Sequence, residues 1–124
     1  MKLAMKLLND FFTIQDHTGQ TVTIGFNSEH VIYKAHFPGK PITPGVCIIE
    51  IVTELLELKL GTQLQLSQVK NLKFINPISP IDDPQVTINF THIDQDDAGL
   101  TRAKGNITGQ SQVFTKFSII YTHR

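Results

Sequence analysis

The chain has 124 residues, a length that suits one domain with a single hydrophobic core. Hydrophobic residues make up 40% of the sequence and charged residues 18%, which excludes a disordered chain and a membrane-spanning one. Eleven basic and eleven acidic residues cancel, so no net charge attracts nucleic acid or an anionic membrane, and neither is expected as a partner.

The N-terminal residues do not form the apolar run of a signal peptide, because Lys6 and Asp10 interrupt it. No apolar stretch approaches the about 18–20 residues that are needed to cross a bilayer. Cys47 is the single cysteine of the chain, so no internal disulfide is expected and no metal-binding spacing is present. We therefore expect a cytoplasmic protein with no metal and no other cofactor.

The first predicted elements are two strands. Residues 11–16 and 21–26 alternate in part between apolar and polar side chains and are rich in β-branched and aromatic types. This pattern predicts a hairpin with its turn at residues 17–20. A loop is expected from residue 27 to residue 43, where Pro38, Gly39 and Pro41 restrict or release the backbone.

A long helix is predicted next. Thr43 is the expected N-cap, Pro44 suits the first helical position, and Gly61 can end the helix after Leu60. Apolar residues cover most of its circumference and leave one polar stripe at helical spacing, formed by Glu50, Thr53, Glu54 and Glu57. A helix this apolar must be enclosed by other elements.

Strands resume after the helix, at residues 64–74, 86–90, 101–107 and 113–121. Hairpin connections are expected at residues 94–99 and 108–111. One long apolar helix within a run of antiparallel strands predicts an α+β fold in which the sheet curls around the helix. No linker or repeat divides the sequence, so residues 1–124 are expected to form one domain.

The most informative segment runs from His36 to Val46 and is followed by Glu50. Proton abstraction beside a carbonyl requires a base, a second acid or base, and N–H donors that face the developing oxyanion. The imidazole of His36 can be the base, because histidine titrates near neutral pH. The N–H of Gly45, at a helix N-terminus, can face the oxyanion, and Glu50 can protonate the departing oxygen.

This segment, His-Phe-Pro-Gly-Lys-Pro-Ile-Thr-Pro-Gly-Val, resembles the active-site signature of the 3-hydroxyacyl-[acyl-carrier-protein] dehydratases of fatty acid synthesis. In that signature an acidic residue follows the histidine by fourteen positions, the separation between His36 and Glu50. Residues 74–80, Phe-Ile-Asn-Pro-Ile-Ser-Pro, resemble a second family segment, Phe-x-x-Pro-Val-x-Pro. The resemblance covers residues 26–90 and implies the hotdog fold, one long central helix wrapped by an antiparallel sheet.

Several positions depart from the family pattern. Ala35 replaces the usual glycine before the histidine, Glu54 replaces a common glutamine, and Ile81 replaces a glycine after the second segment. The N-terminal segment of the housekeeping enzymes has no counterpart in residues 1–16. These differences indicate a short, divergent member of the family.

The resemblance implies dehydration of a 3-hydroxyacyl thioester on acyl carrier protein, in fatty acid or related acyl and polyene synthesis. The implied catalytic residues are His36, Glu50 and Gly45, and the implied substrate-binding residues are Phe37, Pro38, Gly39, Pro44 and Val46. The implied partners are acyl carrier protein with a phosphopantetheine-linked acyl chain and further copies of the chain, as a homodimer or larger homo-oligomer. In such a dimer the family's acidic residue lies across the interface from the histidine.

Other interpretations remain open at this point. Phe37, Ile49 and Phe74 can line an acyl tunnel or simply pack in the core, and Lys40 can meet a carrier protein or only water. Cys47 is expected to be a packed thiol. The other histidines (His17, His30, His92 and His123) have no assigned role, and Glu54 and Glu57 are expected on a solvated stripe. Alternative functions are a hotdog thioesterase, a dehydratase that also isomerises the double bond, and a non-catalytic subunit that partners another dehydratase.

Overall fold

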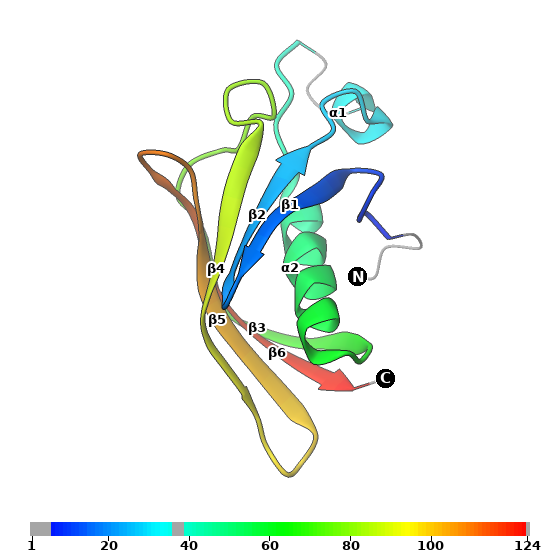
Figure 1. Cartoon of the computed structure of the whole chain (residues 1–124), viewed down its shortest axis with the longest axis vertical. Helices are drawn as coiled ribbons and strands as arrows, with labels where there is room; N and C mark the ends of the chain where they lie inside the picture. Colours follow the sequence, from blue (N-terminus) through cyan, green and yellow to red (C-terminus); the bar gives the residue numbers. More distant parts are fainter. Residues whose placement is uncertain (1–5, 36–38, 124) are drawn as a thin grey trace.

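The computed structural model describes residues 6–35 and 39–123. In chain order the elements are β1 (Phe12–Thr18), β2 (Thr21–Phe26), α1 (Val31–Ala35), α2 (Gly45–Leu60), β3 (Leu64–Phe74), β4 (Gln85–Gln95), β5 (Leu100–Thr108) and β6 (Val113–His123). The predicted α+β class is confirmed, and each predicted strand and the long helix are present (Figure 1).

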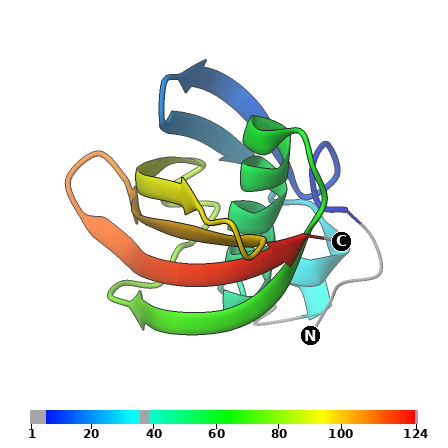
Figure 2. The same cartoon turned by 90° about the horizontal axis from the view of Figure 1, so that it is seen from below.

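The strands form one antiparallel six-stranded sheet in the order β1-β2-β4-β5-β6-β3. Figure 2 shows this sheet curling around α2, which lies against its concave face. The short β1–β2 hairpin and the long β3 strand occupy the two edges of the sheet. At its edge position, β3 has no neighbouring strand on one side of its backbone within residues 6–35 and 39–123.

The core lies between α2 and the concave face. Strand residues alternate between this face and the outside, as Val86, Ile88 and Phe90 of β4 show by being buried. The helix contributes its own buried apolar residues: Cys47, Ile48, Ile51, Val52, Leu55 and Leu56. The apolar pattern that predicted an enclosed helix therefore corresponds to this core.

The two ends of α2 differ in their caps. Gly61 ends the helix in the left-handed conformation, with φ of 68°, and its N–H donates to the carbonyl of Glu57 at 2.8 Å. At the start, Pro44 occupies the N-cap position, so the N-cap lies one residue later than predicted, and no side chain caps the helix. The prediction that Thr43 is the N-cap is wrong, because its hydroxyl lies 2.9 Å from the hydroxyl of Tyr33 instead.

The short helix α1 interrupts the segment that was expected to be a loop. His30 precedes it, and its Nδ1 accepts a hydrogen bond from the N–H of Ile32 at 3.1 Å, as an N-cap side chain does. Tyr33 is the buried residue of this helix. In the described part of the chain, neither helix is long and apolar enough to cross a bilayer.

Candidate active site

The start of α2 lies against the ring of Phe74, at the end of β3. A Cβ atom added to Gly45 would lie 2.8 Å from Cζ of Phe74 and 3.1 Å from its Cε2, so glycine allows this close contact. Among the described residues, none accepts a hydrogen bond from the N–H of Gly45 or Val46. These donors, at the positive end of the helix dipole, can therefore bind a carbonyl oxygen that gains negative charge.

Glu50 lies half-buried on the same helix. At 1.5 Å per residue, its Cα is about 7.5 Å along the helix axis from that of Gly45. Burial, together with the charge of Glu50, raises the pKa of the Cys47 thiol. Burial is also the main reason why the pKa of Tyr121 is raised, and Glu50 adds to it. The carboxylate thus acts electrostatically on a buried, packed cysteine.

The other predicted site residues divide into two groups. Pro44 and Val46 flank Gly45 at the helix start, where Val46 is exposed, and Gly39 is exposed in the preceding segment. His36, Phe37 and Pro38 lie outside the described residues, so their roles stay predictions. Among the predicted site residues, the structure therefore places Pro44, Gly45 and Val46 together at the helix start, beside Phe74.

Tyr33, which the sequence did not single out, precedes the motif, and Thr43, expected only as an N-cap, lies within it. Tyr33 and Thr43 are buried, and their hydroxyl oxygens lie 2.9 Å apart. Burial raises the pKa of the Tyr33 hydroxyl, while its hydrogen bond to Thr43 acts in the opposite direction. The N–H of Thr43 also donates to the carbonyl of Ile78 at 2.8 Å. Thr43 therefore ties the helix start to the second motif as well as to α1.

Glu54 and Glu57 do not form a solvated stripe, so that prediction is wrong. Glu54 is 3% exposed, and its two carboxylate oxygens accept hydrogen bonds from the N–H of Leu7 at 2.8 Å and of Leu8 at 2.9 Å. Glu57 accepts one from the N–H of Leu64 at 2.8 Å. Both carboxylates therefore accept hydrogen bonds from backbone N–H groups of other segments. Glu50 lies on the same polar stripe, nearer the helix start. The sequence signal that could have indicated this role of Glu54 was that it replaces the glutamine common in the family at this position.

A hollow of about 570 Å³ lies away from this site. Its lining includes Thr23 and Thr87, which point outward from β2 and β4 and hydrogen-bond to each other at 3.0 Å. The described lining residues do not include Gly45 or Glu50. The chemistry proposed for the helix start therefore rests on the groups described above rather than on this hollow.

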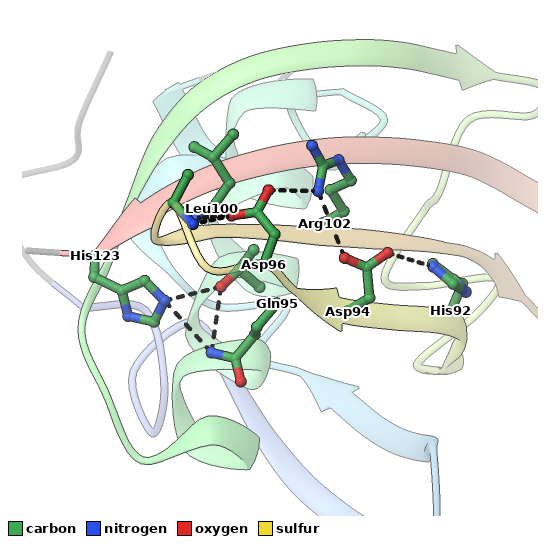
Figure 3. A network of polar contacts seen from close by, with 9 residues as sticks. His92, Asp94, Gln95, Asp96, Leu100, Arg102 and His123 are labelled. Carbon is green, nitrogen blue, oxygen red and sulfur yellow. Dashed lines mark hydrogen bonds and ion pairs between the residues drawn. The ribbon is translucent and has the colours of Figure 1, made fainter.

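A polar network occupies the opposite end of the sheet, around the β4–β5 hairpin (Figure 3). Arg102 Nη1 lies 2.9 Å from an oxygen of Asp96 and 3.6 Å from one of Asp94, which in turn pairs with His92 at 2.8 Å. The N–H of Leu100 and then Arg102 hold the pKa of Asp96 below its usual value. The network closes the hairpin far from Gly45, so it belongs to the fold and not to the candidate site.

Residues 13–110 match the ApeI-like family, described as ApeI dehydratase. The chain belongs to the ApeI-like dehydratase family. A 3-hydroxyacyl-[acyl-carrier-protein] dehydratase FabZ of Clostridium acetobutylicum is 31% identical over 97 residues, which cover 73% of this chain and 67% of that enzyme. This ApeI-like chain is thus a divergent relative of the FabZ enzymes.

Solved structures agree with the fold. The dehydratase heterocomplex ApeI:P of Xenorhabdus doucetiae matches with a TM-score of 0.58 at 19% identity, over 86% of this ApeI-like chain and 92% of that one. A protein of Shewanella oneidensis, assigned provisionally as a thioesterase, matches with a TM-score of 0.53 at 8% identity, over 89% and 80%. At these identities the likeness concerns the fold alone, and it confirms the predicted hotdog arrangement.

Proposed function

We propose that the chain dehydrates a 3-hydroxyacyl thioester on acyl carrier protein to the trans-2-enoyl thioester, in fatty acid or related acyl and polyene synthesis. The observation that carries the proposal is the start of α2. There the N–H groups of Gly45 and Val46 have no acceptor among the described residues, and the missing Cβ of Gly45 leaves room for the ring of Phe74 beside the helix start. This helix start directly follows the dehydratase-like motif that begins at His36.

Each residue has one task in this reaction. His36 removes the proton from the carbon between the thioester carbonyl and the hydroxyl-bearing carbon. The carbonyl oxygen gains negative charge and is stabilised by the N–H of Gly45, a type of contact worth about 3–4 kcal/mol of barrier. In the complex with substrate Glu50 takes part as the protonated acid: it donates its proton to the hydroxyl group, which leaves as water while the double bond forms, and the proton held by His36 then returns to the Glu50 carboxylate.

The proposed assembly is a homodimer, or a larger homo-oligomer, in which Glu50 of one copy meets the His36 segment of the other. The free edge of β3 supports it, since one side of this strand has no neighbour in the described sheet. Val46, Val69 and Phe74 are exposed along this edge and the adjacent helix start. A second copy placed there would cover apolar surface that is otherwise in water.

The remaining parts of the proposal follow from the same activity. A phosphopantetheine-linked acyl chain on acyl carrier protein is the proposed substrate, and the cytoplasm is the proposed compartment. Residues 1–124 are proposed to act as one domain. The residues proposed to contact substrate around the catalytic groups are Phe37, Pro38, Gly39, Pro44 and Val46.

The test is an assay of the purified protein with 3-hydroxyacyl-carrier-protein substrates of several chain lengths. We expect water loss in the forward direction and hydration of the enoyl product in reverse. His36→Ala and Glu50→Gln should each lower kcat by at least about a hundredfold, the lower range for a lost general acid or base. Glu57→Gln is the matched control, because its amide oxygen can still accept from the N–H of Leu64, and it should keep the rate.

The same assay separates the alternatives. If the protein releases free thiol and forms no enoyl product, and if Glu50→Gln abolishes this release, the protein is a thioesterase instead. A protein with neither activity, and unchanged by His36→Ala, would contradict the proposal and favour a non-catalytic subunit. Size-exclusion chromatography with light scattering tests the assembly separately, since a strictly monomeric chain would contradict a site shared between copies.

A further inference from the structure

In the part of the chain that the structure describes, Thr115 is the one buried side chain whose polar atom has no hydrogen-bond partner. It lies in β6 and is 0% exposed. The other buried threonine hydroxyls do have partners: that of Thr43 lies 2.9 Å from the hydroxyl of Tyr33, and that of Thr101 lies 3.0 Å from Nε2 of His123. An unpaired buried hydroxyl lowers the stability of the fold, so its presence indicates a role outside folding, such as ligand binding.

Strand pairing places Thr115 on the concave face of the sheet. Its Cα partner in β5 is Ile107, which is buried in the core. Tyr121 follows six residues later in β6, and its hydroxyl lies 2.9 Å from that of Thr53 in α2. Because alternate residues of a strand share a face, the side chain of Thr115 also faces the helix layer.

The row of paired residues that contains Thr115 ends beside the start of α2. The Cα partner of Thr115 in β3 is Phe74. A Cβ atom added to Gly45 would lie 2.8 Å from Cζ of Phe74, so this ring lies against the helix start. Directly paired residues have Cα atoms about 4.5–5.5 Å apart. Thr115 is therefore one strand away from the residue that contacts Gly45.

The backbone around Thr115 is held by contacts from the segment after β3. The carbonyl of Phe114 accepts hydrogen bonds from the N–H of Ile75 at 2.8 Å and of Asn76 at 3.2 Å. The side-chain amide of Asn76 also donates to the carbonyl of Val113 at 2.9 Å. The hydroxyl of Thr115 therefore projects from a fixed strand, which suits a group that must meet a ligand in a defined geometry.

The surroundings of Thr115 limit what it can bind. Across the neighbouring strands the row continues with Ile107, Ile88 and Val22, which are apolar and buried. On the other side lies Phe74, which is 51% exposed at the edge of the sheet and separates Thr115 from solvent. An occupant must therefore be mostly apolar and carry one hydrogen-bonding group close to the helix start. A 3-hydroxyacyl chain has this distribution, because its hydroxyl lies on the second carbon after the thioester carbonyl.

We propose that Thr115 is a specificity-determining residue, whose hydroxyl forms a hydrogen bond with the 3-hydroxyl group of the bound acyl chain once the ring of Phe74 has turned aside. The inference rests on the proposed dehydratase function, which supplies a substrate with this group. With the carbonyl oxygen at the N–H of Gly45, the 3-hydroxyl group lies further along the chain, towards β6. A threonine hydroxyl can donate to the substrate oxygen or accept from it, whereas a saturated acyl chain leaves it unpaired.

The experiment measures dissociation constants by isothermal titration calorimetry for two pantetheine thioesters of equal chain length. One carries a 3-hydroxyacyl group and the other a saturated acyl group. The full-length protein carries Glu50→Gln, which should prevent turnover, and is expected to prefer the 3-hydroxyacyl ligand. Adding Thr115→Val should reduce this preference by about three- to tenfold, the contribution of one hydrogen bond, and leave binding of the saturated ligand unchanged. Adding Thr115→Ser keeps the hydroxyl and should keep the preference.

Thr101→Val is the matched control. Thr101 is also 0% exposed and lies in a strand, but its hydroxyl is paired with His123. Thr101→Val should lower Tm and keep the ligand preference. Thr115→Val should instead raise Tm by about 2–5 °C, because it replaces an unpaired hydroxyl with a methyl group. The inference is overturned if Thr115→Val keeps the preference, if it weakens both ligands equally, or if Thr101→Val reduces the preference to the same extent.

The binding measurement keeps the inference separate from the proposed function. A wild-type protein that shows no dehydration, but whose ligand preference depends on Thr115, would overturn the proposed function and leave the hydroxyl-binding site in place. An active dehydratase whose preference does not depend on Thr115 would overturn the inference alone. A protein that binds neither thioester would also overturn the inference.

Discussion

The two ends of helix α2 handle their unpaired backbone groups in different ways. At the end, Gly61 closes the helix, and Glu57 accepts the N–H of Leu64, the first residue of the next strand. At the start, Pro44 provides no side-chain cap, and the N–H groups of Gly45 and Val46 have no acceptor among the described residues. A helix N–H group without an acceptor lowers the stability of the fold unless water or a ligand accepts its hydrogen bond.

The three carboxylates of the polar stripe also lie in different surroundings. Glu54 and Glu57 are bound to backbone N–H groups and hold segments of the fold in place. Glu50, nearer the start, acts electrostatically on Cys47 and Tyr121. The later part of the helix thus maintains the fold, whereas the first turns carry the groups to which we assign the proposed reaction.

We expect the largest effect from a substitution in the later part of the helix, on the free energy of unfolding. Glu54→Ala leaves the N–H groups of Leu7 and Leu8 without acceptors, and one lost partner costs about 1–3 kcal/mol. We expect a loss of about 3 kcal/mol in the free energy of unfolding, measured by urea denaturation with circular dichroism.

Glu57→Ala, which removes a single such bond, should cost about half as much, and Glu54→Gln should be intermediate because its amide offers one oxygen. The amide protons of Leu7 and Leu8 should also lose protection from hydrogen exchange in Glu54→Ala. Unchanged protection there would mean that Glu54 does not hold the N-terminal segment.

The next effect concerns the helix start. Gly45→Ala keeps the N–H but adds a Cβ atom that would lie 2.8 Å from Cζ of Phe74. We expect kcat/KM to fall at least about tenfold, a loss of about 1.4 kcal/mol of transition-state stabilisation, with little change in stability. Phe74→Ala in the Gly45→Ala background should relieve the clash without restoring the rate, if substrate itself must approach Gly45. Full recovery of the rate would assign the effect to Phe74 alone.

A third prediction tests whether the open helix start activates Cys47. A helix N-terminus favours a thiolate, but burial and then the charge of Glu50 raise the pKa of this thiol. Cys47 in the folded protein should react with a thiol reagent at neutral pH roughly tenfold more slowly, or slower still, than in the urea-unfolded chain. Glu50→Gln should speed the reaction, because it removes the negative charge. Reaction as fast as in the unfolded chain would contradict this account of the helix start.

The smallest effect lies at the far end of the sheet. Hydrogen bonds from the N–H of Leu100 and from Arg102 lower the pKa of Asp96 in the folded state. A lowered folded pKa means that this contribution to stability is present above the ordinary aspartate value of about 3.9 and is lost as pH falls below it. Asp96→Asn should therefore reduce the acid-side loss of stability, measured by denaturation between pH 2 and pH 6, and leave dehydration unchanged. An unchanged pH dependence would mean that Asp96 is not stabilised as a carboxylate.

The regular elements were readable from the sequence because their signals are local. Alternation predicted the hairpin and the later strands, and Gly61 marked the end of the long helix. Thr43 looked like an N-cap because it precedes Pro44, but Tyr33, ten residues earlier, takes its hydroxyl. Helix α1 is too short for helical periodicity to develop.

The role of Glu54 was hidden for a different reason. Its partners are backbone N–H groups that lie 46 and 47 residues away in the sequence. Almost any residue type can supply a backbone N–H donor, so the sequence does not mark which residue will donate. The partners of Glu54 become visible only in the folded structure. The candidate site shows the same division: its motif was visible in the residues from His36 to Glu50, whereas the contacts that support it required the structure.

The most direct test of the account is a complementation experiment with two inactive variants. His36→Ala and Glu50→Gln are unfolded together, refolded as a mixture and assayed for dehydration. If Glu50 of one copy completes the site of the other, random pairing gives half mixed dimers, each with one intact site, and roughly a quarter of wild-type activity returns. Each variant refolded alone should stay inactive. No recovery in a mixture that contains mixed dimers would contradict a shared site at the start of α2.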